Sequence, residues 1–520
     1  MENILIKKFE KDYEDYLRDE SRKIGNADSI SFPKTEEEII EILKCLAQSK
    51  TLITTQGART GITAGAVPQG GHVLNLSKMN KITGLRYDDT SDTFFLKVQP
   101  GVLLCELREA LKNKTFDTEN WDKTSIDALN KFKKSESYFF PPDPTETTAS
   151  IGGMVSCNAS GACSFKYGPT RDHIEALNIV LVNGDKLYIK RGNEKAYNTH
   201  FSLTTHSGNK IEGNIPSYNL PDVKNASGYY AKNNMDLIDL FIGSEGTLGI
   251  ITEIELKLLK TPKTIYGMNV FFTSEEPALK FVRKIRENSS PAAIEFFNYN
   301  SLNLLRNMKE NYEGFDKLSK LSSHFHSAVY VEYHGNSEEE VMNMLMECCE
   351  MIEECGGDPS DTWLSTNSQS NEALKYFRHA TPEAVNTLID ERRRTVPELT
   401  KLGTDMAVPD SKLEEVMELY NSSLEKLGFD SVIFGHIGNN HLHVNIIPKN
   451  MEEYNKGKEL YSLWAEKIIA LGGTISAEHG VGKLKTNLLQ KMFSIKGIEE
   501  MITLKKLFDP ENRLNKGNLF

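Results

Sequence analysis

The hydrophobic pattern near the N-terminus predicts a helix followed by a buried strand. Apolar residues between positions 39 and 46 recur at helical spacing, and Thr35 precedes them as an N-cap with acidic residues in the first turn. The apolar run 52–55 then predicts a strand that leads into the glycine-rich stretch 56–65. Because backbone N–H groups in such a turn can bind a phosphate, this junction is a candidate binding site.

After Pro262 the pattern changes and predicts an α/β or α+β unit. The expected elements are strands at 265–272 and 327–334, helices at 276–288, 337–355, 371–394 and 454–471, a strand pair around 432–447, and helical residues 481–520. Upstream, an alternating pattern about Asn183-Gly184 predicts a hairpin over 174–190. The charged residues 1–30 are helix-prone, and the polar stretches 113–137 and 192–234 are expected to be surface excursions.

Length and composition narrow the class of protein. The chain has 520 residues, enough for two or three domains, and its net charge of −12 without a basic run argues against nucleic-acid binding. The seven cysteines form no CxxC motif, which is typical of reduced cytosolic thiols and excludes an iron–sulfur cluster of the usual spacing. Neither a signal peptide nor an apolar run of ~20 residues is found. We therefore expect a cytoplasmic protein without a transmembrane segment, and peripheral membrane contact stays open.

A group of histidines near the C-terminal end carries the strongest chemical signal. His436, His441 and His443 are flanked by β-forming residues, and a two-residue turn at Asn439-Asn440 would place His436 directly opposite His443, with Cβ atoms roughly 5 Å apart. Glu478 would then be a third ligand of a metal that keeps open positions for a substrate. A pair formed by His441 and His443 on one strand face is an alternative, and structural, hydrogen-bonded histidines are equally consistent with this spacing.

Three glycine-rich stretches, 56–65, 149–161 and 242–251, are a second signal. The chain contains neither GxGxxG nor GxxxxGK[ST], so a Rossmann nucleotide site and a P-loop have no fingerprint. Each stretch alone is typical of a tight connection. Together, with Thr60, Ser150 and Asn158 as further donors, they favour one long diphosphate ligand such as FAD.

These motifs also resemble a known family in their order and spacing. Residues 57–61, 142–144, 151–153, 166–168 and 246–250 resemble the FAD-binding domain of the vanillyl-alcohol oxidase/p-cresol methylhydroxylase (PCMH) type. Residues 435–445, 477–482 and 508–510 resemble the C-terminal half of its D-2-hydroxyacid dehydrogenase branch, which includes the GlcD-type subunit of glycolate oxidase, D-lactate dehydrogenases and D-2-hydroxyglutarate dehydrogenase. The resemblance implies an α+β fold: an N-terminal helical segment (1–27), a two-subdomain PCMH-type FAD-binding domain (28–262), an α/β cap domain with the metal site (263–480) and a C-terminal helical segment that packs back on the FAD domain (481–520).

The resemblance also implies roles for individual residues. His436, His443 and Glu478 match the ligands of a divalent metal, Zn or Mn, and His479 matches the catalytic base. Arg378 matches the arginine that binds the substrate carboxylate, with Lys401 as a weaker candidate. The residues that match FAD contacts are Gly57, Ala58, Arg59, Thr60, Gly61, Pro142, Asp143, Thr145, Ser150, Gly152, Gly153, Asn158, Gly161, Ile251 and Asn515.

The implied activity is FAD-dependent oxidation of a D-2-hydroxyacid, with D-lactate first and D-2-hydroxyglutarate and glycolate behind it. The loop 57–61 lacks a histidine or cysteine that could tether the flavin, so we predict non-covalent FAD. The family's Asp-Gly-Asn before the second metal histidine is replaced by Asn439-Asn440-His441, and its terminal Asn-Pro-Gly-Lys by residues 515–518. The electron acceptor is expected to be a partner subunit, an electron-transfer flavoprotein, a quinone, a cytochrome or oxygen, and a homodimer is considered. The alternatives are a non-redox enzyme of the alkylglycerone-phosphate synthase type, the FAD subunit of an electron-transfer complex, and a flavin-free zinc hydrolase.

Overall fold

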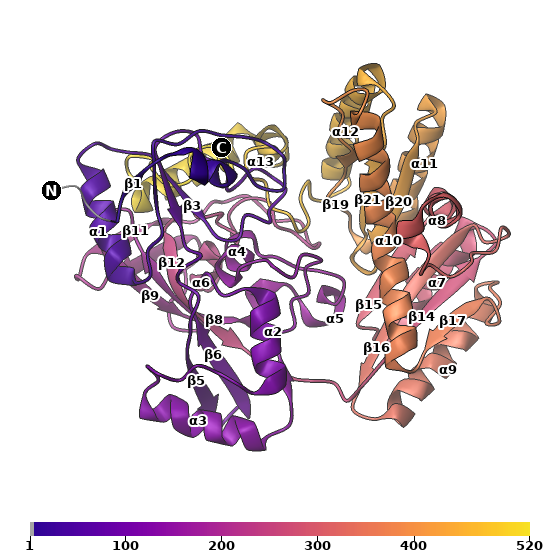
Figure 1. Cartoon of the computed structure of the whole chain (residues 1–520), viewed down its shortest axis with the longest axis horizontal. Helices are drawn as coiled ribbons and strands as arrows, with labels where there is room; N and C mark the ends of the chain where they lie inside the picture. The colour runs from indigo at the N-terminus through magenta and orange to yellow at the C-terminus, as the bar shows by residue number, and fades with distance from the viewer. Residues whose placement is uncertain (1–4) are drawn as a thin grey trace.

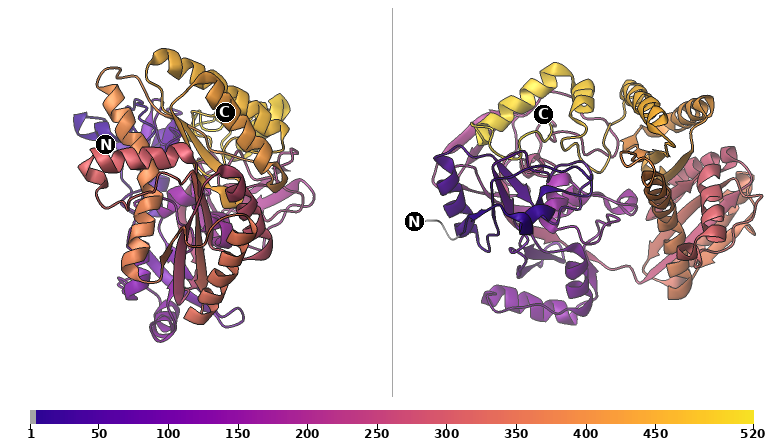
Figure 2. Two further views of the ribbon diagram at one scale, coloured as in Figure 1. Left: turned by 90° about the vertical axis from the view of Figure 1, so that its right-hand side faces the viewer. Right: turned by 45° about the horizontal axis from the view of Figure 1, so that its top comes forward.

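The computed structural model describes residues 5–520, which form two lobes side by side (Figure 1). The N-terminal lobe contains the chain as far as β13 (Leu259–Lys260), and the second lobe begins with β14 (Thr264–Phe272) and includes α12 (Met451–Ala470). After α12 the chain returns to the first lobe as α13 (Thr486–Phe508), which lies on that lobe in both orientations of Figure 2. The architecture confirms the predicted α+β class.

Two sheets organise the first lobe. In the four-stranded sheet the order is β1-β2-β4-β3, and the pairs β2–β4 and β3–β4 are parallel; the strands are β1 (Lys7–Lys8), β2 (Ser29–Ser31), β3 (Ile53–Gln56) and β4 (His72–Asn75). The five-stranded sheet is antiparallel, with the order β5-β6-β12-β8-β9; the strands are β5 (Ile82–Asp88), β6 (Thr93–Val98), β8 (Ile174–Val180), β9 (Lys186–Lys190) and β12 (Ile250–Lys257). Helix α1 (Glu36–Ala47) begins after Thr35, whose hydroxyl accepts the N–H of Glu38 as predicted.

Two expectations for this lobe are corrected. The N-terminal segment holds only a 3-10 helix, Lys11–Leu17, and contributes β1 to the sheet. The stretch 113–137 is not an excursion, because it contains α3 (Lys123–Lys134), which begins at the N-cap Asp122 and buries one apolar face. The other elements of the lobe are α2 (Leu104–Asn113), β7 (Tyr138–Phe139), α4 (Ile151–Cys157), α5 (Ser164–Tyr167), a 3-10 helix at Thr170–His173, β10 (His200–Thr204), β11 (Lys210–Asn214) and α6 (Ile238–Phe241).

The second lobe, the cap, is built on one eight-stranded sheet. Its path is β17-β14-β16-β15-β20-β21-β18, and β19 also pairs with β21. Besides β14, the strands are β15 (Ala293–Phe297), β16 (Ser327–Gly335), β17 (Thr362–Ser365), β18 (Leu402–Gly403), β19 (Met406–Ala407), β20 (Ser431–His436) and β21 (His441–Ile446). Besides α12, the helices are α7 (Glu275–Asn288), α8 (Tyr299–Asn311), α9 (Glu338–Glu354), α10 (Ser368–Arg393) and α11 (Leu413–Leu427), with short 3-10 turns at Glu313–Phe315, Asp410–Lys412 and Ile437–Asn439.

Alternating residues of β16 show how the cap sheet is covered. Val329, Val331 and Tyr333 belong to the core beneath α7 and α9, whereas Ala328 and Tyr330 belong to the core beneath α8 and α10. This alternation follows from the period of two along a strand. The face that carries Tyr330 therefore also carries Glu332.

The end of the chain completes the first lobe. Leu514 forms a parallel bridge with Ile53, and Asn515 accepts the N–H of Thr55 through its side-chain oxygen at 2.8 Å. The buried Lys505 donates to the carbonyl of Thr247 and to the carboxylate of Asp509. The cap is thus an insertion between two parts of one lobe. Among residues 5–520, no helix has the length and apolar character needed to cross a bilayer.

Candidate active site

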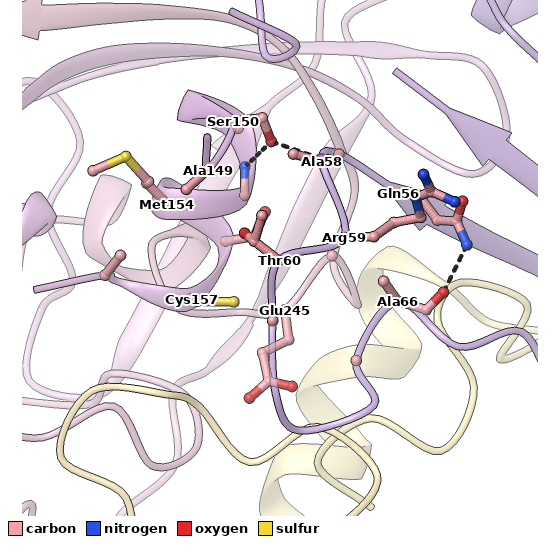
Figure 3. Close-up of a pocket in the computed structure, with 18 of the residues that line it drawn as sticks. Gln56, Ala58, Arg59, Thr60, Ala66, Ala149, Ser150, Met154, Cys157 and Glu245 are labelled. Carbon is pink, nitrogen blue, oxygen red and sulfur yellow. Dashed lines mark hydrogen bonds between the residues drawn. The ribbon is translucent and has the colours of Figure 1, made fainter. Parts of the chain in front are cut away.

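A cavity of about 340 Å³ lies at the carboxyl end of β3 (Figure 3). Its walls are the loop 56–66, the first turn of α4 and the turn 245–249, and His479 with Glu478 closes one end. The hydroxyl of Ser150 joins two of these walls, because it accepts the N–H groups of Ala58 and Gly153, both at 3.3 Å.

Most of the predicted cofactor residues line this cavity. They are Gly57, Ala58, Arg59, Thr60, Gly61, Thr145, Ser150, Gly152, Gly153, Ile251 and Asn515. Pro142, Asp143, Asn158 and Gly161 are not part of its wall. Asn158 instead caps α4 in the left-handed region and accepts the N–H of Arg171, and a Cβ at Gly161 would lie 2.0 Å from the carbonyl oxygen of Asp143. These two residues therefore shape the loops behind the cavity.

The cavity wall suits a ligand that approaches the backbone closely. A Cβ at Gly57 would meet the Ser150 hydroxyl at 2.1 Å, and Gly246, with φ +70°, would meet the Asn515 side chain at 2.7 Å. Glycine is therefore required where the wall folds back on itself. The exposed peptide groups and the Arg59 and Thr60 side chains fit the diphosphate of a dinucleotide.

Glu245 is a wall residue that the sequence did not single out. Its buried carboxylate accepts the N–H groups of Val481 at 2.6 Å and Gly482 at 2.8 Å. This contact fixes the loop that carries His479 to the first lobe. Nothing in the local sequence reveals it, because the partners are more than two hundred positions apart.

The histidine hairpin lies in the cap, but its register differs from the prediction. His436 pairs with His441, and His443 pairs with Phe434. The turn is longer than two residues because Ile437–Asn439 form a 3-10 turn and Asn440, with φ +49°, ends it. His443 is therefore a diagonal neighbour of His436, and their ring centroids are 5.5 Å apart.

All three histidines and Glu478 nevertheless form one cluster. One ligand atom from each lies within 4.8 Å of the others, so the two alternative pairs merge into a single group. The Glu478 Oε2 atom lies 3.4 Å from His436 Nε2 and 3.7 Å from His441 Nδ1, and Oε1 lies 4.0 Å from His443 Nε2. For bonds of about 2.0–2.1 Å to a tetrahedral ion, ligand atoms are separated by roughly 3.3 Å, so the spacing suits a metal better than direct hydrogen bonds.

Acceptors behind the histidines orient their rings. His436 Nδ1 lies 2.5 Å from Glu295 Oε1, and His443 Nδ1 lies 3.2 Å from the Thr404 carbonyl, which leaves Nε2 of each ring for a ligand. Such outer partners are typical of metal-binding histidines. Among residues 5–520, the buried Nδ1 of His441 has no hydrogen-bond partner. Burial alone would lower the pKa of His436, but the Glu295 carboxylate outweighs burial and raises it to about 9, so the cluster stabilises positive charge.

Lys224 is the second residue that sequence reasoning missed. It comes from the stretch 192–234 that was expected to be a surface excursion, yet only 7% of its side chain is exposed, and its Nζ lies 2.6 Å from Glu478 Oε2. The neighbouring backbone is bonded to the segment before Glu478, since the N–H of Ala226 donates to the Ser476 carbonyl. The polar Lys-Asn-Ala-Ser sequence gave no signal for this burial.

His479 stands between the cavity and the cluster. Its Nε2 lies 3.3 Å from Glu478 Oε1, and its Nδ1 lies 3.2 Å from Asp405 Oδ2. Burial would lower the pKa of His479, but the carboxylates of Asp405 and Glu478 raise it to about 9. Asp405 in turn accepts a hydrogen bond from Lys485 Nζ at 2.6 Å, which holds the carboxylate in place.

Arg378 and Lys401 differ in position. The Arg378 guanidinium lies 5.9 Å from the centre of the Tyr330 ring and makes no hydrogen bond or ion pair within residues 5–520. Burial alone would lower its pKa, but Glu295, Tyr330, Asp143 and Glu332 raise it, so Arg378 stays charged. Lys401 is not brought to this cluster: its Nζ donates to Asn386, and the nearby charge that affects its pKa is Arg22.

Comparison with known proteins decides the family. Residues 261–519 match the family model described as "FAD linked oxidases, C-terminal domain", and residues 27–120 and 124–188 match the "FAD binding domain" model. The chain belongs to the FAD-linked oxidase family. As an FAD-linked oxidase it is a flavoprotein oxidoreductase, and the cavity at β3 lies in its FAD-binding domain.

Named relatives resemble this FAD-linked oxidase over nearly its whole length. It is 29% identical to a D-lactate dehydrogenase of Anaerostipes hadrus, over 97% of this chain and 92% of the relative. It is 29% identical to glycolate oxidase subunit GlcD of Bacillus subtilis (95% and 89%) and 25% identical to a D-2-hydroxyglutarate dehydrogenase of Stutzerimonas stutzeri (97% and 94%). Among solved structures, alkyldihydroxyacetonephosphate synthase has the same fold, with a TM-score of 0.64 at 15% identity over 99% of this chain and 82% of that one.

Proposed function

We propose that this oxidase converts a D-2-hydroxyacid, with D-lactate as the first candidate, to the 2-oxoacid. The observation that carries the proposal is the placement of His479 between the FAD cavity and the His/Glu cluster, with the unpaired, charged Arg378 within the electrostatic reach of Glu295 behind that cluster. A base, a cation site and a carboxylate-binding arginine are what oxidation of a hydroxyacid needs. The names of the relatives support the same reaction class.

Each residue has a separate task in this reaction. When bound, FAD supplies the hydride acceptor for the substrate's C2 hydrogen, and a divalent ion, Zn or Mn, held by His436, His443 and Glu478 supplies a Lewis acid for its hydroxyl. His479 removes the hydroxyl proton through Nε2, while Asp405 holds its Nδ1 and stabilises the charged ring. Such a base is typically worth ~10²–10⁴-fold in rate. Arg378 binds the substrate carboxylate, for which a planar guanidinium is well suited.

The distribution of charge favours a substrate with one carboxylate. The other cations around the cluster already have partners: Lys224 is bonded to Glu478, Lys485 to Asp405, and Lys166 to the His334 carbonyl. The acids that surround Arg378, among them Glu295, would repel a second carboxylate. This supports D-lactate or glycolate over D-2-hydroxyglutarate.

Electrons then pass from the flavin to an acceptor outside the described residues, such as a partner subunit, an electron-transfer flavoprotein, a quinone or a cytochrome. We propose a cytoplasmic location, with membrane contact limited to the periphery, and non-covalent FAD. A non-redox reaction of the alkylglycerone-phosphate synthase type is the second candidate. Its support is the shared fold alone, whereas the dehydrogenase function also explains the base and the cation site.

The test is anaerobic reduction of the bound flavin. The purified protein is mixed with D- and L-lactate, glycolate and D-2-hydroxyglutarate, and the absorbance near 450 nm is followed. Rapid bleaching by D-lactate, lost with a chelator and restored by Zn²⁺ or Mn²⁺, is expected. His479→Ala should keep FAD and lose bleaching. Stable flavin absorbance with every acid would support the non-redox candidate, and full reduction of His479→Ala would exclude His479 as the base.

A further inference from the structure

A second polar cluster lies on the cap sheet beside the proposed active site. Tyr330, Glu332 and His334 alternate along β16 and therefore share the face that carries Arg378's side of the cap. Cys163 and Tyr167, at α5 of the FAD lobe, reach the same place. The proposed reaction uses none of these side chains directly.

The geometry of this cluster is that of a hydrogen-bond chain. Tyr167 Oη lies 2.7 Å from His334 Nδ1, His334 Nε2 lies 2.7 Å from Glu332 Oε1, and the Tyr330 hydroxyl donates to Glu332 Oε2. Cys163 Sγ also donates to Glu332 Oε1, at 3.5 Å. Cys163, Glu332 and His334 are the right types to ligate a metal. However, the 2.7 Å contact is a hydrogen bond, shorter than the roughly 3.3 Å between ligands of one tetrahedral ion, and each of these polar atoms already has a partner.

The chain crosses from one lobe to the other. Its first member, Tyr167, belongs to the FAD lobe, and its other members belong to the cap. Lys166 strengthens the crossing, because its Nζ donates to the His334 carbonyl at 3.1 Å. The aromatic rings of Tyr167 and His334 also pack together, with centroids 5.6 Å apart.

The other end of the chain reaches Arg378. The Tyr330 ring lies 5.9 Å from the guanidinium carbon, and its hydroxyl is held by Glu332, so the ring has one orientation. Tyr330 is also the direct cross-strand partner of Glu295, the carboxylate behind His436. Glu332 and Tyr330 are among the groups that raise the pKa of Arg378, which agrees with this proximity.

We propose that the chain Tyr167–His334–Glu332–Tyr330 positions the Arg378 guanidinium and makes carboxylate binding depend on docking of the cap against α5. The inference rests on the proposed function, because Arg378 must bind the substrate. Tyr167 is a positioning residue in this scheme. It lies in the other lobe and acts on Arg378 only through the hydrogen bonds of the chain.

The test is Tyr167→Phe, which removes one hydroxyl and keeps the ring. Anaerobic flavin reduction is measured over a range of D-lactate concentrations, which separates the apparent Kd for the acid from the limiting rate. We expect the apparent Kd to rise about 3–10-fold, the range of one hydrogen bond, with the limiting rate within about 2-fold of wild type and FAD content unchanged. Tyr188→Phe, at an exposed tyrosine of the same lobe, is the matched control and should change neither quantity.

A double-mutant cycle with Arg378→Lys shows whether Tyr167 acts through Arg378. In the Arg378→Lys background, Tyr167→Phe should change the apparent Kd less than about 2-fold. An unchanged Kd in Tyr167→Phe, or an equal effect in both backgrounds, would overturn the inference. If Arg378→Lys itself leaves the Kd unchanged, the proposed role of Arg378 is wrong, which is a separate result. Should Tyr167→Phe lose FAD, His334→Gln provides the same comparison from the cap side.

Discussion

Replacing Lys224 by Met tests the cation site most directly. The substitution keeps the length and apolar stem of the side chain and removes the ammonium group that lies 2.6 Å from Glu478 Oε2. The exposed fractions of the two side chains are 7% and 10%, so solvent cannot replace the lost charge. Glu478 would become a buried carboxylate without its nearest counter-charge.

The expected effect depends on whether a divalent ion is present. Breaking a buried pair costs about 3–5 kcal/mol, and we expect about 3 kcal/mol because His436 and His479 remain 3.4 and 3.3 Å from the carboxylate. That corresponds to an apparent Tm roughly 6–12 °C lower in chelator. A bound divalent ion neutralises the same carboxylate, so the loss should shrink to about 1 kcal/mol in saturating metal. The difference of about 2 kcal/mol means roughly 30-fold tighter metal binding by Lys224→Met.

Thermal unfolding in chelator and in excess Zn²⁺ or Mn²⁺, together with a metal titration, measures both quantities. Lys232→Met is the control, because Lys232 lies in the same segment and is exposed. An equal loss of stability with and without metal, or weaker metal binding by Lys224→Met, would refute the reasoning that the ammonium and the metal neutralise one carboxylate.

Three further outcomes are expected. The rate of flavin reduction should rise with pH because the raised pKa of His479, about 9, leaves the base protonated near neutrality, and Asp405→Asn should move this rise to lower pH; a move to higher pH would contradict the role of Asp405. Burial lowers the pKa of His72 from 6.5 to about 4, so stability present above pH 6.5 should fall by up to about 3 kcal/mol as the pH drops toward 4, and denaturant unfolding of His72→Gln should show a smaller fall. Acid precipitation should release all flavin into solution, because burial raises the pKa of Cys157, a thiol in the cavity wall, to about 12 and keeps it unreactive; flavin in the pellet would show a covalent link.

Local pattern was a good guide where apolar residues recur regularly. The predicted strand 265–272 and helix 276–288 correspond to β14 and α7 within one residue at each end, because the apolar faces are continuous and the ends carry turn residues. Helix α3 was missed because its lysines and asparagine outweigh the apolar residues that it buries, Ala128, Leu129 and Phe132. In such a helix, tertiary packing overrides a weak composition signal.

The site was predictable only as far as its residues stand in motifs. The histidine cluster was visible as a group, but the hairpin register was wrong, because Asn439-Asn440 also suits a longer turn that ends with Asn440 in the left-handed region. Lys224, Glu245 and Glu295 lie far from the histidines in sequence, and their types are those of ordinary surface residues. Only the fold brings their charges into the interior, so no local pattern could indicate them.

The insertion of the cap into the FAD lobe has a consequence for folding. Thr55 and Asn515, joined by a 2.8 Å hydrogen bond in the cavity region, are 460 positions apart. Closing so long a loop in an unstructured chain costs roughly 5 kcal/mol of entropy, whereas a folded cap replaces much of the loop with a rigid body. The cap should therefore fold before the last wall of the cofactor cavity forms. On heating, loss of cap structure should release that wall first, and flavin fluorescence should rise before the N-terminal sheets melt.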